Sequence, residues 1–462
     1  MTQIIEIKKG TSQENALFIS PTQCKTWKIQ QGETKTIQFG TKEIPCTIYH
    51  RENLYDDECI LSAEAWDELY IPFSLNVTVE YDMVDRIYLG PIIGIFTAGF
   101  TGSILRPIGE RSFLFAKYIH AAQTSGSIAF VFGSHHIHWN EGVVEGYTFL
   151  KSGWKKIKLP IPNVVYDRLP NRKTEKHPSY SEVRERLQTD YDIPWFNPGF
   201  FSKSSIYDQL IRLPHVNKFL PVTIASPTQE EIKKFVHDHK HVYIKPKNGS
   251  LGLGIHQIIF DEKDNFYYCR FRDHTRNRLR RYSSLSRLLK TQFPSGYDHL
   301  VIQQGIDLLK YQNNPIDFRV HTNKDEFGNW KISAIAAKIA GTGSVTTHVK
   351  SGGHVKSVNE IWSDLQLNKS LLEDLKKAAI SLTLAIDETT DGHVGEIGFD
   401  LGIDEEENVW MFEANSKPGR TIFSHPKLKK EDHLTRKMPM TYAAYLYQEA
   451  IQDMKSNSQM PI

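Results

Sequence analysis

A lysine followed by a glycine-rich loop is the first segment whose residue types and spacing could do chemistry. The stretch HVYIKPKNGSLGLGIHQI at 241–258 predicts a strand ending near Lys245, a loop and a second strand. Gly249, Gly252 and Gly254 would let backbone N–H groups approach phosphate oxygens closely, and the lysine adds a positive charge. A mobile hairpin is the alternative. The strand after the loop distinguishes this segment from a P-loop or dinucleotide fingerprint, which a helix follows.

A second segment contains carboxylates and an amide. The stretch GEIGFDLGIDEEENVWMFEANSKPG at 395–419 predicts two strands joined by an acidic turn. Because side chains alternate along a strand, Met411, Glu413 and Asn415 share one face. If the hairpin pairs as the turn suggests, Asp400 lies opposite Met411 and diagonal to Glu413. Two carboxylates and an amide oxygen are ligands that suit a Mg²⁺ ion shared with phosphates, and a solvated polar edge is the alternative.

A third segment supplies glutamines, a carboxylate and an arginine. The stretch LVIQQGIDLLKYQNNPIDFRVHT at 300–322 predicts an apolar strand ending in Gln303 and Gln304, then a second strand with Asp317 and Arg319. An arginine aligned with a phosphate-binding lysine would stabilise the charge of a phosphoryl group during its transfer. A structural ion pair between Asp317 and Arg319 is the alternative interpretation.

The composition limits the classes of protein. A chain of 462 residues has room for several domains, and 40% apolar with 24% charged residues is typical of a folded globular protein. A net charge of +2 gives no reason to expect nucleic acid or a membrane as a partner. Four scattered cysteines favour reduced thiols, and there is no signal-peptide pattern or membrane-spanning segment. We therefore expect a cytoplasmic location.

The N-terminal half predicts strands first and an α/β unit second. Residues 1–85 alternate with period two and contain turn residues, which predicts a small β module. Apolar strands at 90–97 and 127–132, with helical spacing at 111–122 between them, predict a parallel α/β unit. The polar, proline-punctuated stretch 168–182 predicts a loop or linker.

The C-terminal half alternates helices and strands around the three segments. An apolar stripe predicts a helix at 370–386, and further helices are expected at 203–211, 228–239 and 283–291. Six arginines occur between residues 270 and 281. Such a run is typical of a solvated, mobile face, and the functional alternative is a landing surface for a polyanionic substrate such as an acidic peptide.

The segments IKPKNGSLGLGI, DFRV, EIGFDL and FEANSKPG, in this order over residues 196–450, resemble the ATP-grasp superfamily. The stretch GPIIGIFT, the YDR at 166–168 and the overall length are most similar to the YheC/YheD-type endospore coat-associated family, its longer YheD-like branch in particular. The resemblance covers the whole C-terminal half and reaches into the N-terminal half.

This resemblance implies a multidomain chain of the α/β and α+β classes. A β-rich module at 1–85 and a Rossmann-like α/β pre-ATP-grasp domain at 86–195 would precede an ATP-grasp domain at 196–455. That domain would consist of two α+β subdomains with ATP and Mg²⁺ between them. The last residues, 456–462, are expected to form a disordered tail.

The same resemblance implies roles for individual residues. The positions that match the ATP-binding residues of the superfamily are Lys203, Lys245, Lys247, Gly249, Ser250, Gly252, Gly254, Gln303, Gln304 and Ile306. The positions that match its Mg²⁺ ligands are Asp400, Glu413 and Asn415, and the catalytic positions are Arg319 and Lys338. The ending NSKPGRTIFSHPKL resembles the segment that shapes the substrate side in D-alanine ligases.

Two positions depart from the related ligases. Enzymes similar to the ribosomal-protein glutamate ligase usually carry arginine where this chain has Lys338, and asparagine where it has His348. Lysine keeps the positive charge but cannot grip a phosphate with a bidentate fork. We therefore expect this change to affect nucleotide binding less than catalysis.

The leading hypothesis is an ATP- and Mg²⁺-dependent carboxylate–amine ligase of the peptide-forming type, which acts through an acyl phosphate. By resemblance it would be associated with formation of the endospore coat. The sequence names neither the acid nor the amine, and an acidic peptide or a spore-coat protein is the candidate partner. The alternatives are a phosphotransferase and a non-catalytic nucleotide-binding coat or assembly protein.

Overall fold

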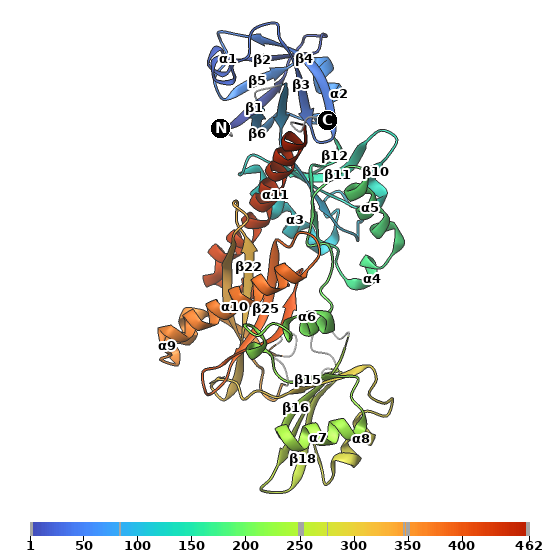
Figure 1. Cartoon of the computed structure of the whole chain (residues 1–462), viewed down its shortest axis with the longest axis vertical. Helices are drawn as coiled ribbons and strands as arrows, with labels where there is room; N and C mark the ends of the chain where they lie inside the picture. The colour runs from blue at the N-terminus through green and yellow to red at the C-terminus, as the bar shows by residue number, and fades with distance from the viewer. Residues whose placement is uncertain are drawn as a thin grey trace.

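The computed structural model describes residues 3–82, 85–247, 254–274, 276–344, 347 and 352–458. In this part of the chain a closed barrel and three further sheets follow one another along the long axis of the molecule (Figure 1). Among the described residues, no helix combines the length and the apolar character that crossing a membrane would require.

The N-terminal module is the closed barrel. Its strands are ordered β1-β5-β2-β4-β3-β7-β6, with bounds β1 (Gln3–Lys9), β2 (Ala16–Ile19), β3 (Thr34–Phe39), β4 (Lys42–His50), β5 (Glu58–Leu61), β6 (Leu75–Tyr81) and β7 (Arg86–Leu89). Helices α1 (Pro21–Trp27) and α2 (Ala63–Glu68) lie between strands. Period-two alternation buries Ile5 and Ile7 inside the barrel. The barrel includes β7 and therefore extends beyond residue 85.

The second sheet is the expected parallel α/β unit. Strands β8 (Ile92–Phe96), β9 (Ile128–Phe132), β13 (Val164–Asp167) and β14 (Trp195–Phe196) are parallel, and β10 (Ile137–His138), β11 (Val143–Leu150) and β12 (Gly153–Pro160) extend one edge. Helix α3 (Ser112–Gln123) connects β8 to β9. The stretch 168–182 is not a simple linker, because it contains α4 (Arg172–Glu175) and begins α5 (Pro178–Thr189).

The third sheet is antiparallel and carries helices on one face. Its order is β15 (Thr223–Ala225), β20 (Leu300–Gln304), β16 (His241–Pro246), β17 (His256–Asp261), β18 (Phe266–Asp273) and β19 (Arg276–Tyr282). Helices α7 (Gln229–His239) and α8 (Leu285–Gln292) bury apolar side chains against Val242 and Ile244 of β16. Lys245, the next residue after Ile244, therefore projects from the opposite face.

The fourth sheet has the order β24 (His354–Ser357), β23 (Trp330–Ile339), β22 (Asn314–Lys324), β25 (Glu396–Ile403) and β26 (Val409–Asn415), and β21 (Lys310–Tyr311) pairs with β22. Helices α6 (Lys203–Leu210), α9 (Val358–Asp364) and α10 (Lys369–Thr389) pack on one face. Phe318 and Val320 of β22 point into that core. Asp317 and Arg319 alternate with them and lie on the other face.

A long C-terminal helix, α11 (Lys429–Ser458), joins the fourth sheet to the second sheet and reaches the barrel (Figure 1). Its residues Met440, Ala443 and Ile451 belong to the apolar core of the second sheet. Lys455 Nζ lies 3.1 Å from Glu80 Oε1 of β6. The expected disordered tail is wrong for 456–458, because these residues continue the helix.

Candidate active site

A β-bulge places two carboxylates side by side on the open face of the fourth sheet. Asp400 of β25 pairs with Glu413 of β26, whereas the next residue, Leu401, pairs with Met411. Phe412 is therefore an extra residue in β26, and the expected pairing of Asp400 with Met411 is wrong. Because one inserted residue reverses the alternation, Met411 points into the core and Glu413 points to the same face as Asp400.

The carboxylate of Asp400 is held by two cations from neighbouring strands. Arg319 Nε lies 2.9 Å from Asp400 Oδ1, and Arg319 Nη2 donates a hydrogen bond to Asp400 Oδ2 at 3.2 Å. Lys338 Nζ lies 2.8 Å from Asp400 Oδ1 and 2.9 Å from Asp317 Oδ1. Burial by itself would raise the pKa of Asp400, but Arg319 and Lys338 outweigh it and lower that pKa to about 2.

The alternative of a structural pair between Asp317 and Arg319 is wrong. The registers place Asp317 beside Lys338 and Arg319 beside Asp400, so each charge finds its partner on a neighbouring strand. The four side chains are 12–15% exposed. Asp317 also accepts a hydrogen bond from Thr347. This partly buried network holds Arg319 and Lys338 beside the carboxylate pair.

Lys203 contacts Glu413, and Lys245 of another structural unit lies within range of both charges. Lys203, the first residue of α6, has its Nζ 3.4 Å from Glu413 Oε1. Lys245 of the third sheet donates to Gln303 Oε1 at 2.8 Å. Burial and, to a smaller extent, the charge of Lys203 lower the pKa of Lys245 to about 8, with Glu413 opposing both effects. The three charges are therefore close enough to influence one another across the two sheets.

The remaining predicted nucleotide residues lie along the end of β20 and the chain that leaves it. Gln303 Nε2 donates to Thr223 Oγ1 at 3.0 Å, and Gln304 Oε1 accepts from the backbone of Val222 at 3.3 Å. Ile306 is buried at 8% exposure. This segment leads from the third sheet toward the fourth.

The other predicted loop residues are more dispersed. Lys247 contacts Ser226 Oγ beyond the end of β16. Gly254 has φ +75°, and a Cβ there would lie 2.9 Å from Pro246. The predicted residues Gly249, Ser250 and Gly252, and the departure at His348, lie outside the described residues.

A buried network connects the site to the second sheet. Tyr166 donates to Glu396 Oε1 at 2.6 Å, and Arg168 contacts the same oxygen. Lys417 Nζ lies 2.5 Å from Asp167 Oδ1, and the two side chains are 3% and 2% exposed. Sequence analysis noted the YDR at 166–168 and the NSKPG segment only through resemblance. It missed Glu396, whose position inside EIGFD was the available signal.

Asn197 fixes the same junction through its side-chain amide. Its Nδ2 donates to the backbone oxygens of Glu396 at 2.9 Å and Ser416 at 2.6 Å, and its Oδ1 accepts from Gly395 at 2.9 Å. Sequence analysis did not single out this residue. Its buried amide ties the chain leaving β14 to both β25 and the end of β26.

The donor chemistry of the site fits a hard divalent cation. Asp400 stays deprotonated at neutral pH because its pKa is about 2. Glu413 of β26 lies opposite Asp400, and Asn415 lies two residues further along β26. Oxygen donors of this kind suit Mg²⁺. Among the described residues, no three or more His, Cys, Asp and Glu side chains are grouped to hold a metal ion. The predicted set has two carboxylates and an amide, so phosphate oxygens would have to complete it.

Comparison with known proteins agrees with this architecture. A model of the family described as YheC/D like ATP-grasp matches residues 192–446. The chain is also 39% identical over 448 residues, 95% of each chain, to the endospore coat-associated protein YheD of Bacillus subtilis (strain 168). The chain belongs to the YheC/D-like ATP-grasp family. The endospore coat-associated protein YheC of the same organism is 22% identical, over 66% of this chain and 84% of its own.

Solved structures of other proteins align at lower similarity. The D-alanine–D-alanine ligase from Bacillus anthracis complexed with ATP is 12% identical, with 78% of this chain and 100% of that chain covered and a TM-score of 0.44. A Chryseobacterium gregarium RiPP-associated ATP-grasp ligase in complex with ADP and a leader and core peptide is 16% identical, with 75% and 94% covered and a TM-score of 0.40.

Membership of the YheC/D-like ATP-grasp family confirms the resemblance and the multidomain α+β fold expected from the sequence. The matched region contains the third and fourth sheets, each with helices on one face. The site lies where the faces opposite those helices supply charged side chains. Lys245 comes from the third sheet, and Asp400 and Glu413 come from the fourth.

Proposed function

We propose that the protein is an ATP- and Mg²⁺-dependent ligase that joins a carboxylate to an amine in formation of the endospore coat. One observation carries the proposal. Lys203 contacts Glu413 of a carboxylate pair that is bordered by Arg319 and Lys338, and the charges of Lys203 and Glu413 also act on Lys245 of the third sheet. Cations around a site of hard oxygen ligands would neutralise the several negative charges that the phosphates of a nucleoside triphosphate carry.

The proposed chemistry has two steps. An oxygen of the substrate carboxylate attacks the γ-phosphorus of ATP, the bond to the β-phosphate oxygen breaks, and ADP leaves. The nitrogen of the amine then attacks the carbonyl carbon of the acyl phosphate, and inorganic phosphate leaves with the bonding electron pair as the amine loses a proton. Positioning and charge stabilisation suffice for both steps, so no covalent nucleophile of the protein is needed.

The side chains divide these tasks by position. Lys203 and Lys245 neutralise phosphate oxygens, and Arg319 stabilises the phosphoryl group during transfer. Lys338 keeps its charge near Asp400 because two carboxylates hold it. Asp400, Glu413 and Asn415 would hold Mg²⁺, which supplies neutralisation of the phosphate charges when it is bound.

Thermal unfolding tests the nucleotide site first. A ligand that binds only the folded state raises the melting midpoint, and at one hundred times its Kd it stabilises by about 2.7 kcal/mol. We expect a Mg²⁺-dependent rise with ATP in the wild type and its loss in Glu413→Ala. Glu406→Ala, in the exposed turn between β25 and β26, is the matched control and should keep the rise. Absence of a rise in the wild type would refute the proposal.

Turnover separates the ligase from its main alternative. A screen of acids and amines should find pairs that release phosphate and form an amide in the wild type. Stabilisation by ATP without phosphate release for any pair would favour a nucleotide-binding assembly protein. That alternative is supported by Lys338, which occupies a position where related ligases carry arginine and which two carboxylates already engage.

A further inference from the structure

The third sheet ends in an exposed strand that carries arginines. Strand β19 is last in the sheet order and pairs with β18, so the backbone groups on its outer side face away from the sheet. Residues 276–281 are all exposed. Arg276, Arg278 and Arg280 share one face of this strand by alternation, and we name this set the arginine edge.

The arginine edge is strongly cationic. Six arginines lie between residues 270 and 281, against one acidic residue, Asp273. Arg278 Nε is 3.6 Å from Asp273 Oδ2, and the guanidinium of Arg280 lies over the ring of Phe271 at 5.3 Å. Stacking on an aromatic ring orders a guanidinium while leaving its N–H groups free for an anion.

The spacing of these charges fits an extended chain. Alternate residues of a strand are about 6.8 Å apart, and a second strand added in register has the same repeat. An added strand would take its hydrogen bonds from the outer backbone groups of β19. Charged side chains on an edge strand also protect a protein from pairing with itself. Arginines repel a basic strand, a second copy of β19 included, but they attract an acidic one.

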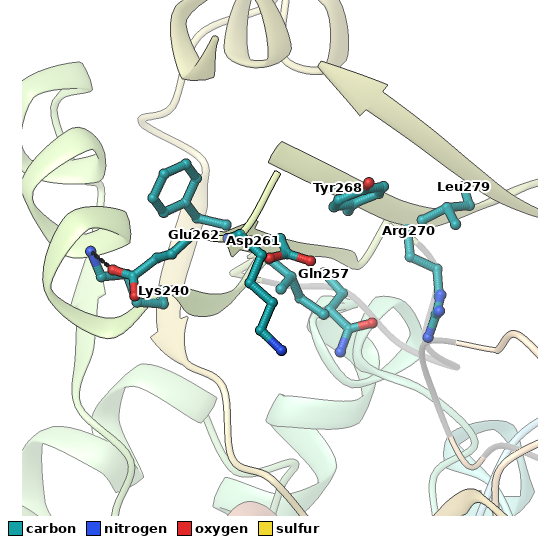
Figure 2. A pocket seen from close by; sticks show the side chains of 10 residues that line it. Lys240, Gln257, Asp261, Glu262, Tyr268, Arg270 and Leu279 are labelled. Carbon is teal, nitrogen blue, oxygen red and sulfur yellow. Dashed lines mark hydrogen bonds and ion pairs between the residues drawn. The ribbon is translucent and has the colours of Figure 1, made fainter. Parts of the chain in front are cut away.

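The other face of the same strands is hollowed and partly apolar. A cavity of about 560 Å³ is lined by residues that include Tyr268 and Arg270 of β18 and Leu279 of β19. Figure 2 shows these three side chains gathered on one side of the cavity. Leu279 is 58% exposed. A strand added to β19 would therefore place one set of side chains near the arginine edge and the alternate set near Leu279.

The strand register places the start of β19 level with Lys245, with the arginine edge on the helix-bearing face of the sheet and Lys245 on the opposite face. Ile244 of β16 is level with His256, Phe271 and Arg278 on the successive strands. Asn277 Nδ2 donates to the backbone oxygen of Thr342 at 3.5 Å. Thr342 follows β23, the strand of the fourth sheet that carries Lys338.

We propose that the arginine edge binds, by strand addition, an extended peptide segment with acidic residues at alternate positions. Resting on the proposed ligase function, this segment belongs to the polypeptide whose carboxylate the enzyme activates. The segment would run along β19 and deliver the adjoining part of the chain to the phosphate-binding end of the site. The substrate class is therefore an acidic polypeptide rather than a free amino acid.

Binding is tested with a fluorescein-labelled Glu-Thr-Glu-Thr-Glu-Thr-Glu peptide, followed by anisotropy on the full chain. Replacing three arginines, in R276Q/R278Q/R280Q, should weaken binding roughly tenfold, because each exposed charge pair that is lost contributes a small factor to the affinity. The control K369Q/K376Q/K377Q removes three cations from α10 and should bind as the wild type does. Equal weakening in both variants would overturn the proposal.

The backbone contribution has its own test. Only one edge of an added strand can bond to β19, so N-methylation of alternate residues on one edge of the peptide should abolish binding, and on the other edge should leave it unchanged. Equal effects of both methylated peptides would overturn strand addition. Tighter binding of a five-nucleotide DNA strand than of the peptide would overturn the choice of an acidic peptide and indicate a nucleic-acid surface.

The docking surface and the ligase function can be refuted independently of each other. Binding of the acidic peptide by the wild type but not by R276Q/R278Q/R280Q, without phosphate release, would keep the docking surface and refute the ligase. Phosphate release with small acids that is equal in the wild type and this variant, without any peptide binding, would keep the ligase and refute the docking surface.

Discussion

Replacement of Lys245 by methionine should stabilise the protein at neutral pH when no nucleotide is present. Burial, reinforced by Lys203, lowers the pKa of Lys245 from its ordinary 10.5 to about 8. Below pH 8 Lys245 is therefore protonated in the folded protein, where its ammonium charge is less stable than in the unfolded chain. The difference corresponds to ~3.4 kcal/mol at about 1.36 kcal/mol for each pH unit.

The substitution also removes a favourable contact. Lys245 donates to Gln303 Oε1 at 2.8 Å, and the loss of such a hydrogen bond costs about 1 kcal/mol. The expected net gain at pH 7 is therefore about 2 kcal/mol in the free energy of unfolding. This value is an upper limit, because Lys245 remains partly exposed to solvent.

Because the pKa of Lys245 is lower in the folded state, the stability difference between the wild type and the methionine variant depends on pH. A folded-state pKa below the unfolded one means that stability rises as pH increases from about 8 toward 10.5, where both states of the wild type lose the proton. The methionine variant lacks this rise. Its advantage should therefore fall by about 2.5 kcal/mol between pH 7 and pH 10, and the two proteins should then be nearly equal in stability.

Urea unfolding at pH 7 and pH 10 measures both quantities. Lys247→Met, with the same chemical change two residues further along, is the matched control and should show no such pH-dependent difference from the wild type. A Lys245→Met variant that is less stable than the wild type at pH 7, or whose advantage is the same at both pH values, would refute the reasoning.

Two further predictions concern the frame of the site. Lys417→Met leaves the carboxylate of Asp167 buried without its cation, and should lower the free energy of unfolding by about 3–5 kcal/mol in urea titrations; a loss below about 1 kcal/mol would contradict the buried pair. Deletion of Phe412 removes the bulge but leaves a regular ladder with Glu413 still opposite Asp400 on the open face, so the MgATP-dependent rise in melting midpoint should persist, as it should after deletion of Glu406 in the exposed turn; loss of the rise in the Phe412 deletion alone would contradict this register.

Much of the local structure followed from residue types and spacing. The strand before Lys245, the strand after its loop and the hairpin with an acidic turn are all present, as β16, β17 and the β25–β26 pair. These elements were predictable because side-chain periodicity and turn residues act over short distances in the chain. The helix that begins at Lys203 was also predictable, and Ser202 caps it by accepting from the backbone of Ser205.

The linker at 168–182 shows where local composition was misleading. Its polar residues and prolines suggested a loop, but Asn171 caps one helix, and Pro178 occupies the first turn of the next. Polar capping residues and proline are favourable at helix starts as well as in loops. The composition alone did not separate the two structures.

By itself, the sequence determined which short stretches form strands and helices and which residue types could bind phosphate and Mg²⁺. The tertiary structure decided which charges meet. Arg319 contacts Asp400 rather than Asp317, and the bulge at Phe412 turns Glu413 toward Lys203. The physical reason is that strand register and packing between distant segments set these contacts, and a one-residue shift reverses every following side chain without changing the local pattern.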